Sequence, residues 1–422
     1  MVPGRLDEFE NLDCAMLSGT NTVGPGSKLD LIERIAASFS PSAPIDSRVY
    51  SGRESQFADV LNACVQRGQH AVVFGERGAG KTSLVNAIGQ TLKIKFQMPK
   101  CGTINCDQTT TFASLWRSIF LEIPISRNTS ISGQQGGVER TQGTFAQDLP
   151  EDVTPHTVRK LLENRGRFLI IIDEVDRIKD RSTTTLLADT IKSLSDHGVD
   201  TTLVLVGVAE SVDTLIAEHE SVQRALIQVH LPRMSQAEIG RIVDNGLAAA
   251  GMAIEQAARS RICKLSQGLP HYAHLLGMHS ALAAATQDRS NIRIEDVHMA
   301  LRKALKHARQ SISDDYERAA TSSEETLYRW VLLACALTNT DEHGYFNAGD
   351  VARPMSVLMK RECQALLFSR HLNAFCEDKH GPALQRTATA LGYKYKFKNA
   401  ALQPYIIMKE LDAGRLVLTE LT

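Results

Sequence analysis

The chain has 422 residues, of which 43% are hydrophobic and 23% are charged, and its net charge at pH 7 is −1. This length allows two or three domains, and the near-neutral charge excludes a polybasic protein that binds nucleic acid over its whole surface. No apolar run is long enough to span a bilayer and residues 1–8 lack the features of a secretory signal, so we expect a cytoplasmic protein with no membrane partner.

Residues 1–40 are predicted to form an N-terminal arm, which is loose over 1–27 and contains one short helix over 28–37. Pro41 and Pro44 then mark an extended segment, and residues 53–67 have helical spacing. The eight cysteines contain no C-x-x-C pair. This spacing argues against a zinc site and favours reduced, mostly buried thiols.

A glycine-rich loop follows an apolar run over residues 71–74 and precedes a helix-like segment. Its pattern, G-x-x-x-x-G-K-[ST], is typical of a phosphate-binding loop when strand and helix flank it in this order. Backbone N–H groups and the positive end of the helix dipole then point at the anion. We expect Lys81 to reach the β- and γ-phosphates and the Thr82 hydroxyl to ligate magnesium. The predicted nucleotide-binding residues of this loop are Gly75, Glu76, Arg77, Gly78, Ala79, Gly80, Lys81, Thr82 and Ser83.

A second apolar run, Phe168 to Ile172, ends in Asp173 and Glu174. A continuous apolar run of this length predicts a parallel strand buried on both faces. Ligands of open α/β sheets bind at the carboxyl ends of such strands, so Asp173 is expected to orient magnesium beside the phosphate loop. Glu174 is then the candidate base that polarises the attacking water. Alternatively, the two acids only cap the structure that follows the strand.

Alternating strand and helix patterns over residues 41–233 predict an α/β domain with a parallel sheet and helices on both faces. The expected strands include 101–105 and 202–206, and the expected helices include 112–120, 154–165 and 181–196. Residues 124–150 are rich in Ser, Thr, Gly and Gln, which predicts a flexible surface insertion.

After residue 233 the pattern becomes helical, with predicted helices over 235–250, 254–267, 270–286 and 294–310. We interpret residues 234–312 as a helical lid domain. The last unit, 313–422, begins with a helix through Leu327 and continues with short helices near 347–352, 355–361 and 363–377. An alternating stretch over 393–398 follows, and the whole order predicts a winged helix-turn-helix.

The alternating stretch carries the strongest indication of DNA binding. In a strand, its three lysines would share one face and its aromatic residues the other. Lysines on such a wing could contact backbone phosphates, and the candidate recognition helix adds an arginine and a histidine. Alternatively, the lysines only keep an edge strand soluble. The candidate DNA-binding residues are Arg370, His371, Lys394, Lys396 and Lys398.

Taken together, these motifs resemble the AAA+ ATPases, and more narrowly the origin-recognition and archaeal initiator clade. The segment from Ser51 to Glu54 matches a motif that borders the adenine in that clade, which implies nucleotide contacts for Gly52 and Arg53. The phosphate loop, the acidic strand, the lid and the C-terminal winged helix match in order and position. The resemblance implies a P-loop NTPase sheet of the AAA+ type with ATP and Mg²⁺ as cofactors.

Further roles follow from the resemblance alone. Arg224 lies where an arginine finger would reach a neighbouring subunit's ATP, and Arg233 is a second candidate. Glu210 or Ser211 lies where the clade has a polar sensor. His271 replaces an arginine that normally contacts the γ-phosphate, which favours slow hydrolysis or a switch. The Gly268-Leu269-Pro270 sequence before it is similar to the lid of STAND-type signalling NTPases.

These observations predict an ATP-binding and hydrolysing switch that self-associates and contacts double-stranded DNA, with Lys81, Glu174 and Arg224 as catalytic residues. GTP in place of ATP stays open. One alternative is a STAND-like signalling or anti-phage ATPase whose winged helix contacts a protein. Another is an adaptor for transposition or helicase loading.

Overall fold

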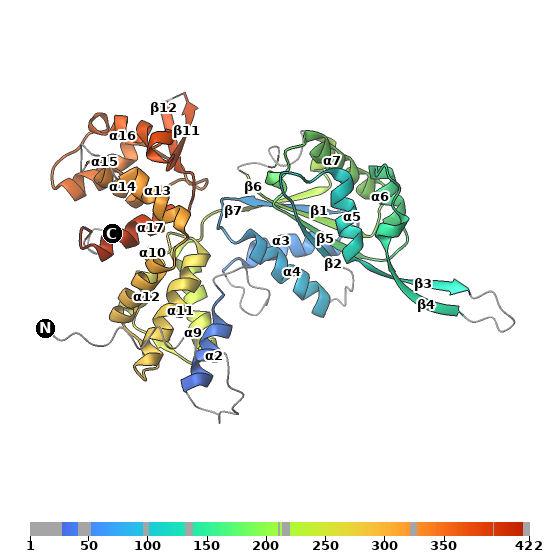
Figure 1. Ribbon diagram of the computed structural model, residues 1–422, viewed down its shortest axis with the longest axis horizontal. Helices are drawn as coiled ribbons and strands as arrows, with labels where there is room; N and C mark the ends of the chain where they lie inside the picture. Colours follow the sequence, from blue (N-terminus) through green and yellow to red (C-terminus); the bar gives the residue numbers. More distant parts are fainter. Residues whose placement is uncertain are drawn as a thin grey trace.

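A parallel sheet of five strands, in the order β2-β5-β6-β1-β7, organises the N-terminal half of the chain (Figure 1). The computed structural model describes residues 28–40, 52–95, 101–130, 138–209, 212, 220–320, 327–390 and 392–416. The strands are β1 (His70–Gly75), β2 (Cys101–Asn105), β5 (Phe168–Asp173), β6 (Thr201–Val208) and β7 (Leu226–Leu231). Because β6 lies between β1 and β5, the phosphate loop and the acidic residues meet at one edge of the sheet.

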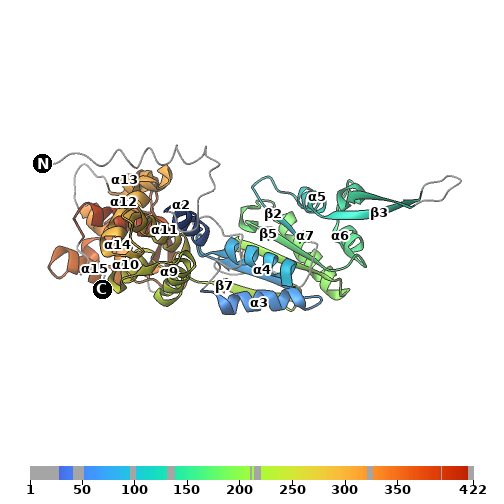
Figure 2. The ribbon, with the colours of Figure 1, turned by 90° about the horizontal axis from the view of Figure 1, so that it is seen from below.

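Helices cover both faces of this sheet, as its apolar strands predict (Figure 2). On one face, α3 (Glu54–Val65) packs on β1 and β7 and α4 (Lys81–Lys95) on β1, β5 and β6, in a core that includes Leu169 and Ile171 of β5. On the other, α5 (Phe112–Glu122), α6 (Pro155–Leu162) and α7 (Arg181–Asp196) pack on Ile170 and Ile172. Successive side chains of β5 therefore point into two different hydrophobic cores, one on each face of the sheet. This arrangement confirms the predicted α/β fold.

The insertion predicted over residues 124–150 contains regular structure that its composition did not indicate. The segment forms an antiparallel hairpin of β3 (Pro124–Ser130) and β4 (Val138–Thr144), which projects away from the sheet (Figure 1). A 3₁₀ turn, η1 (Phe145–Asp148), returns the chain to the domain. The fully buried Phe145 anchors this return between Phe120 and Phe168, an aromatic contact that the low apolar content of the segment did not predict.

The four predicted lid helices are present as α9 (Gln236–Ala250), α10 (Gln256–Leu265), α11 (Pro270–Thr286) and α12 (Ile294–Lys306). A short parallel pair, β8 (Ala253–Ile254) and β9 (Asn291–Ile292), joins two of their connections. The short helix predicted within the N-terminal arm is present as α2 (Lys28–Ser38), and it packs on the lid helices, because Ile35 and Phe39 are buried in the lid core. Phe39 lies against Gly246 and Gly277, where any side chain would collide with its ring.

The C-terminal unit combines helices with a three-stranded antiparallel sheet in the order β10-β12-β11. Its elements are α13 (Gln310–Ala320), α14 (Leu327–Leu337), β10 (Phe346–Asn347), α15 (Ala348–Met359), η4 (Ala365–Leu367), α16 (Ser369–Ala374), η5 (Asp378–His380), β11 (Leu384–Thr389), β12 (Gly392–Phe397) and α17 (Leu402–Asp412). Helix α15 continues through Pro354, where two helices were expected, because Val351 and Met355 bury the same face on both sides of it. The order of α14, β10, α15, α16, β11 and β12 is compatible with the expected winged helix, which stays a prediction.

Neither a membrane span nor a metal-binding cluster occurs among the described residues. None of their helices combines the length and apolarity needed to cross a membrane. None of their His, Cys, Asp and Glu side chains gather in groups of three or more that could hold a metal ion. Six described cysteines are free thiols, of which Cys64, Cys106, Cys263, Cys335 and Cys363 are buried.

Candidate nucleotide-binding site

The phosphate loop is held between its own sheet and the lid. A Cβ atom at Gly75, where φ is 147°, would collide with the carbonyl of Leu231 on the neighbouring strand β7, so only glycine fits. On the lid side, a Cβ built on Gly80 would lie 3.4 Å from Cγ of Pro270, the first residue of α11. The Gly-Leu-Pro sequence of the lid therefore packs directly over the loop.

Lys81 lies at the centre of the loop and is buried. Its Nζ atom donates hydrogen bonds to the carbonyl oxygens of Gly75 (3.0 Å) and Glu76 (2.9 Å). Burial lowers the pKa of Lys81 to about 8, although Asp176, Asp173 and Glu76 oppose the shift. A phosphate beside this ammonium would supply a negative counter-ion and so favour the charged form of the lysine. This is the role expected of the lysine in such a loop.

Thr82 and Asp173 meet across the sheet edge. The Thr82 hydroxyl donates to Oδ2 of the buried Asp173 at 2.7 Å, and the other carboxylate oxygen accepts from the backbone N–H of Glu174 at 2.7 Å. A hydroxyl and a carboxylate are oxygen donors of the kind that Mg²⁺ prefers. The geometry therefore fits the predicted magnesium site, with Thr82 and Asp173 as the residues that would hold the ion.

Glu174 is turned away from this pair in the structure. Its backbone is left-handed, with φ at 56°, and its carboxylate accepts from Nη1 of Arg177 at 2.7 Å. This contact raises the pKa of Arg177. To polarise a water molecule, as predicted, Glu174 would first have to leave Arg177.

Asp176 is a site residue that the sequence reasoning missed. Its Oδ1 atom accepts from the backbone N–H of Val208 at 2.7 Å, which ties the acidic strand's loop to the end of β6. Among nearby charges, Asp176 also does most to favour the charged form of Lys81 and so to raise the pKa of that lysine. The spacing Asp173-Glu174-x-Asp176 was visible in the sequence and could have identified it.

The segment expected to border the adenine is buried inside the protein instead. Arg53 is only 2% exposed, and its guanidinium donates to the carbonyl of Pro232. Gly52, at φ 91°, lies against the backbone and Cβ of Glu238 at the start of the lid. Gly52 and Arg53 thus help to fix the junction between β7 and the lid, and nucleotide contact by these two residues stays a prediction.

Arg233, the second candidate for an arginine finger, points into its own phosphate loop. Its Nε and Nη2 atoms donate to the two carboxylate oxygens of Glu76 at 2.6 and 3.1 Å. In this arrangement the guanidinium is engaged within its own chain, and a finger role for Arg233 would require it to leave Glu76, so that role stays a prediction. Arg224 is exposed beyond α8 (Glu220–Gln223) and stays a prediction, whereas Glu210 and Ser211 lie outside the described residues.

His271 occupies the first turn of α11, beside the loop, and is exposed. Its ring meets the ring of Tyr272 edge-on, with the centroids 5.3 Å apart. The glycines of the phosphate loop lie against two other lid residues, Leu269 and Pro270. Nucleotide binding by His271 therefore stays a prediction.

The predicted DNA-binding residues have different environments. His371 is fully buried and packs edge-on against Tyr328, so its expected contact with DNA is corrected to a core position. Lys394 pairs with Asp341 at 3.0 Å, and Nζ of Lys396 lies 5.1 Å from the ring centroid of Tyr345. Arg370 lies in α16, and Lys398, just beyond β12, is exposed.

One family of known proteins matches most of the chain. Its model, described as Novel STAND NTPase 1, matches residues 37–358. No curated protein sequence matches the chain.

Solved structures are similar to the chain at low identity. Drosophila ORC bound to DNA is 14% identical with a TM-score of 0.43, covering 96% of this chain and 99% of that one. The Aeropyrum pernix ORC1 protein in complex with DNA is 14% identical with a TM-score of 0.45, covering 87% and 95%. A Walker-type ATPase of Pyrococcus abyssi is 15% identical with a TM-score of 0.48, covering 84% and 95%.

The buried ammonium of Lys81 leads to a first prediction. Because its pKa is lowered to about 8, its charge destabilises the folded chain below that pH, and the cost is relieved as pH rises further. Lys81→Met should therefore raise the free energy of unfolding at pH 7 by about 1–3 kcal/mol in the absence of nucleotide. The same variant should lose nucleotide binding. Urea denaturation and titration with a fluorescent ATP analogue measure both effects.

The matched control for this prediction is Lys93→Met, which removes an exposed lysine from the same helix. It should leave both the unfolding midpoint and the nucleotide affinity unchanged. A Lys81→Met protein that is less stable than the wild type at pH 7 would contradict the conclusion that the buried charge of Lys81 destabilises the folded chain.

Proposed function

The chain belongs to the novel STAND NTPase 1 family, and on that premise we propose that it is an ATP-dependent switch. In the closed state its C-terminal unit packs on the lid and on the phosphate loop, and ATP binding releases it. The observation that carries the proposal is the direct contact between the C-terminal unit and the loop that is to hold the phosphates.

The contact with the nucleotide domain is made by the connection between α14 and β10. A Cβ built on Gly344 would lie 3.2 Å from Oε1 of Glu76 in the phosphate loop. Next to it, the ring of His343 lies 5.1 Å from the ring of His230 on β7, centroid to centroid. Asp341 fixes this connection by accepting from the backbone N–H groups of His343 and Tyr345. The nucleotide site and the C-terminal unit are thus in contact without an intervening layer.

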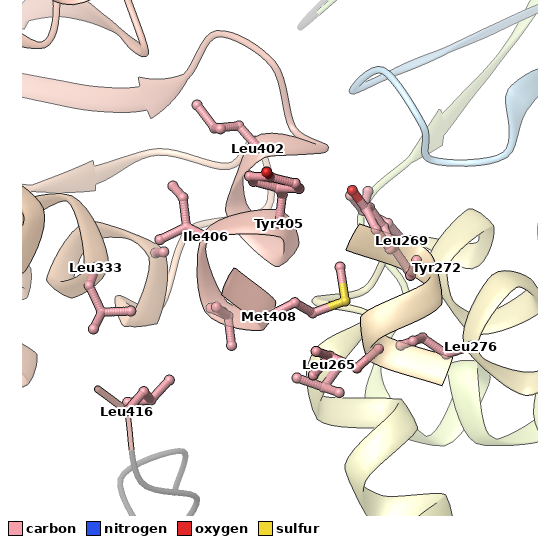
Figure 3. Close-up of a cluster of buried hydrophobic side chains, with 14 of the residues drawn as sticks. Leu265, Leu269, Tyr272, Leu276, Leu333, Leu402, Tyr405, Ile406, Met408 and Leu416 are labelled. Carbon is pink, nitrogen blue, oxygen red and sulfur yellow. The ribbon is translucent and has the colours of Figure 1, made fainter. Parts of the chain in front are cut away.

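The contact with the lid is apolar and extensive. Figure 3 shows Met408 of α17 extending toward Leu265 and Leu276 of the lid, whereas Ile406 points toward Leu333 of its own unit. The Tyr272 hydroxyl adds a hydrogen bond of 2.8 Å to the carbonyl of Ala401. Burial of such side chains stabilises the closed arrangement, at about 25 cal/mol for each Å² of apolar surface. These side chains belong to one hydrophobic core that spans both units and includes Leu265, Leu269, Tyr272 and Leu276 of the lid and Met408 of α17.

The residues of the site support slow turnover, as befits a switch. Lys81 would bind the β- and γ-phosphates, and Thr82 and Asp173 would hold Mg²⁺. The ion, when bound, would neutralise charge on the phosphate oxygens. Glu174 polarises the attacking water only after it leaves Arg177, so each turnover includes that rearrangement. Arg224 is exposed and remains our candidate for a finger that a neighbouring copy supplies.

A second candidate function is DNA contact by the C-terminal unit, which we take to be a winged helix. The observation that favours it is the lysine row on β12, where Tyr395 and Phe397 are buried and Lys394 and Lys398 are exposed. Lys394 and Lys396 face the connection that touches the phosphate loop, through Asp341 and Tyr345. DNA contact would therefore follow release of this unit.

Release of the C-terminal unit can be tested on a variant that keeps ATP intact. In Glu174→Gln, ATP should increase the rate of amide hydrogen exchange in α17 and in the connection from Asp341 to Tyr345, whereas ADP should not. Lys81→Met is the control, because it should exchange identically with and without ATP. Equal protection of α17 in the ATP-bound and ADP-bound Glu174→Gln protein would contradict the switch.

A milder change should bias the same equilibrium. Tyr272→Phe removes one hydrogen bond across the interface, worth about 1 kcal/mol, and should shift the balance about fivefold toward the open state. Tyr405→Phe is a matched control, since its hydroxyl bonds Ser313 within the C-terminal unit. The ATP concentration for half-maximal exchange of α17 should fall in the first variant only. A fall of the same size in both would show that the interface hydrogen bond is not responsible.

DNA contact predicts a change in salt dependence. Replacing Lys394, Lys396 and Lys398 together by Glu should abolish DNA binding at low salt while nucleotide affinity is retained. Single replacements by Gln should lower the slope of log K against log salt by about 0.9 for each phosphate that is no longer neutralised. Fluorescence anisotropy with a labelled duplex, in the presence of ATP, measures the slope. Unchanged binding by the triple variant would remove DNA as a ligand of this wing.

A further inference from the structure

The Glu76 carboxylate is largely shielded from solvent although it belongs to a loop that is to receive phosphates. Its side chain is 9% exposed, and that of Arg233, its partner, is 14% exposed. The guanidinium binds both carboxylate oxygens, at 2.6 and 3.1 Å. This fork geometry is the one with which arginine also recognises phosphate.

The residues immediately before and after Arg233 are both fixed by hydrogen bonds. Arg53 donates to the carbonyl of Pro232, and the backbone N–H of Met234 donates to the carbonyl of Gly268 at 2.9 Å. A side chain at Gly268 would crowd Cβ of Arg233, at 2.9 Å, so the lid backbone comes as close as glycine permits. The backbone of Arg233 is therefore fixed between β7 and the lid, and only its side chain is left to move.

The remaining nitrogen of Arg233 joins two further units of the chain. Nη1 donates to the side-chain oxygen of Gln403 on α17 and approaches the carbonyl of Gln267 in the lid at 3.4 Å. Gln403 is itself buried, and its amide nitrogen donates to Ala336 and to Gln267. One guanidinium thus connects the phosphate loop, the lid and the C-terminal unit.

We propose that Glu76 is an internal substitute for a nucleotide phosphate, and that Arg233 senses ATP by exchanging this carboxylate for the terminal phosphate. The proposal rests on the proposed ATP switch and assigns it a trigger. A triphosphate bound at Lys81 brings negative charge toward the Glu76 carboxylate. Transfer of Arg233 to the phosphate lets Glu76 turn to solvent and withdraws Nη1 from Gln403. ADP, which lacks the terminal phosphate, leaves the Glu76 pair intact.

The competing explanation is a purely structural ion pair that fastens the lid to the loop. Both explanations expect Arg233 to matter for stability, because removal of one partner leaves a buried charge without compensation. Only the exchange expects the two nucleotides to respond differently. Discrimination between ATP and ADP, and not stability, is therefore the decisive readout.

The test measures the affinities of ATP and ADP by calorimetry for the full chain carrying Glu174→Gln, so that ATP is not consumed. Arg233→Met should weaken ATP binding at least about tenfold relative to ADP binding. Glu76→Gln should do the reverse, with a several-fold gain in ATP affinity, because Arg233 no longer has a charged competitor. If Arg233→Met does not fold, Arg233→Lys keeps the charge without the fork and should lose most of the preference for ATP.

The controls use a similar pair elsewhere between the nucleotide domain and the lid. Glu54 of α3 and Arg241 of α9 form an exposed pair at 3.5 Å, and Glu54→Gln and Arg241→Met should not change either affinity. An equal loss of ATP and ADP binding in Arg233→Met, or no loss of either, would overturn the exchange. Absence of nucleotide binding by the parent protein would overturn both this inference and the proposed function. Normal discrimination with no change in the exchange of α17 would refute the switch alone.

Discussion

Three structural units meet at one partly buried guanidinium, and its charge constrains how they can be arranged. Arg233 is satisfied by the carboxylate of Glu76, the amide oxygen of Gln403 and the lid backbone. A buried cation without such partners is costly, so the phosphate loop, the lid and α17 cannot separate independently. The closed arrangement is therefore one cooperative state, and whatever binds Arg233 in place of these partners acts on all three units together.

The charges around the phosphate loop explain why the group that replaces these partners of Arg233 should be an anion. Lys81 is buried with its ammonium on two backbone carbonyls, and burial, with a smaller contribution from the charge of Arg77, lowers its pKa despite three nearby acids. Asp173 and Asp176 are already engaged, with Thr82 and with the backbone of Val208. A phosphate chain with a divalent cation adds negative charge beside Lys81 and positive charge beside Asp173. Both additions relieve an existing imbalance of the site.

The sequence predicts the parts of this site that depend on local pattern. The phosphate loop, the acidic strand and the four lid helices follow from periodicity and short motifs, and they are found where expected. Strand β7 and helix α17 were missed, because Leu226–Leu231 alternates weakly and α17 is apolar on most sides. The roles of Arg53 and Glu76 depend on residues about 160 to 180 positions away in the chain, and no local pattern encodes those contacts. His371 was misplaced for the same reason, since only the fold brings Tyr328 against it.

The interface between α17 and the lid also bears on self-association. In the closed state it buries Met408, Leu265 and their neighbours in one hydrophobic core that spans both units. Release of the C-terminal unit would expose these side chains, and large exposed apolar patches are characteristic of protein–protein contact sites. An ATP-bound open form would thus expose an apolar surface suited to protein–protein contact. Arg224, the candidate finger, is already exposed. The apolar surface that is buried between α17 and the lid in the closed state would then be the surface that the open state offers to another copy. Nucleotide binding and self-association would thus be coupled through this one surface.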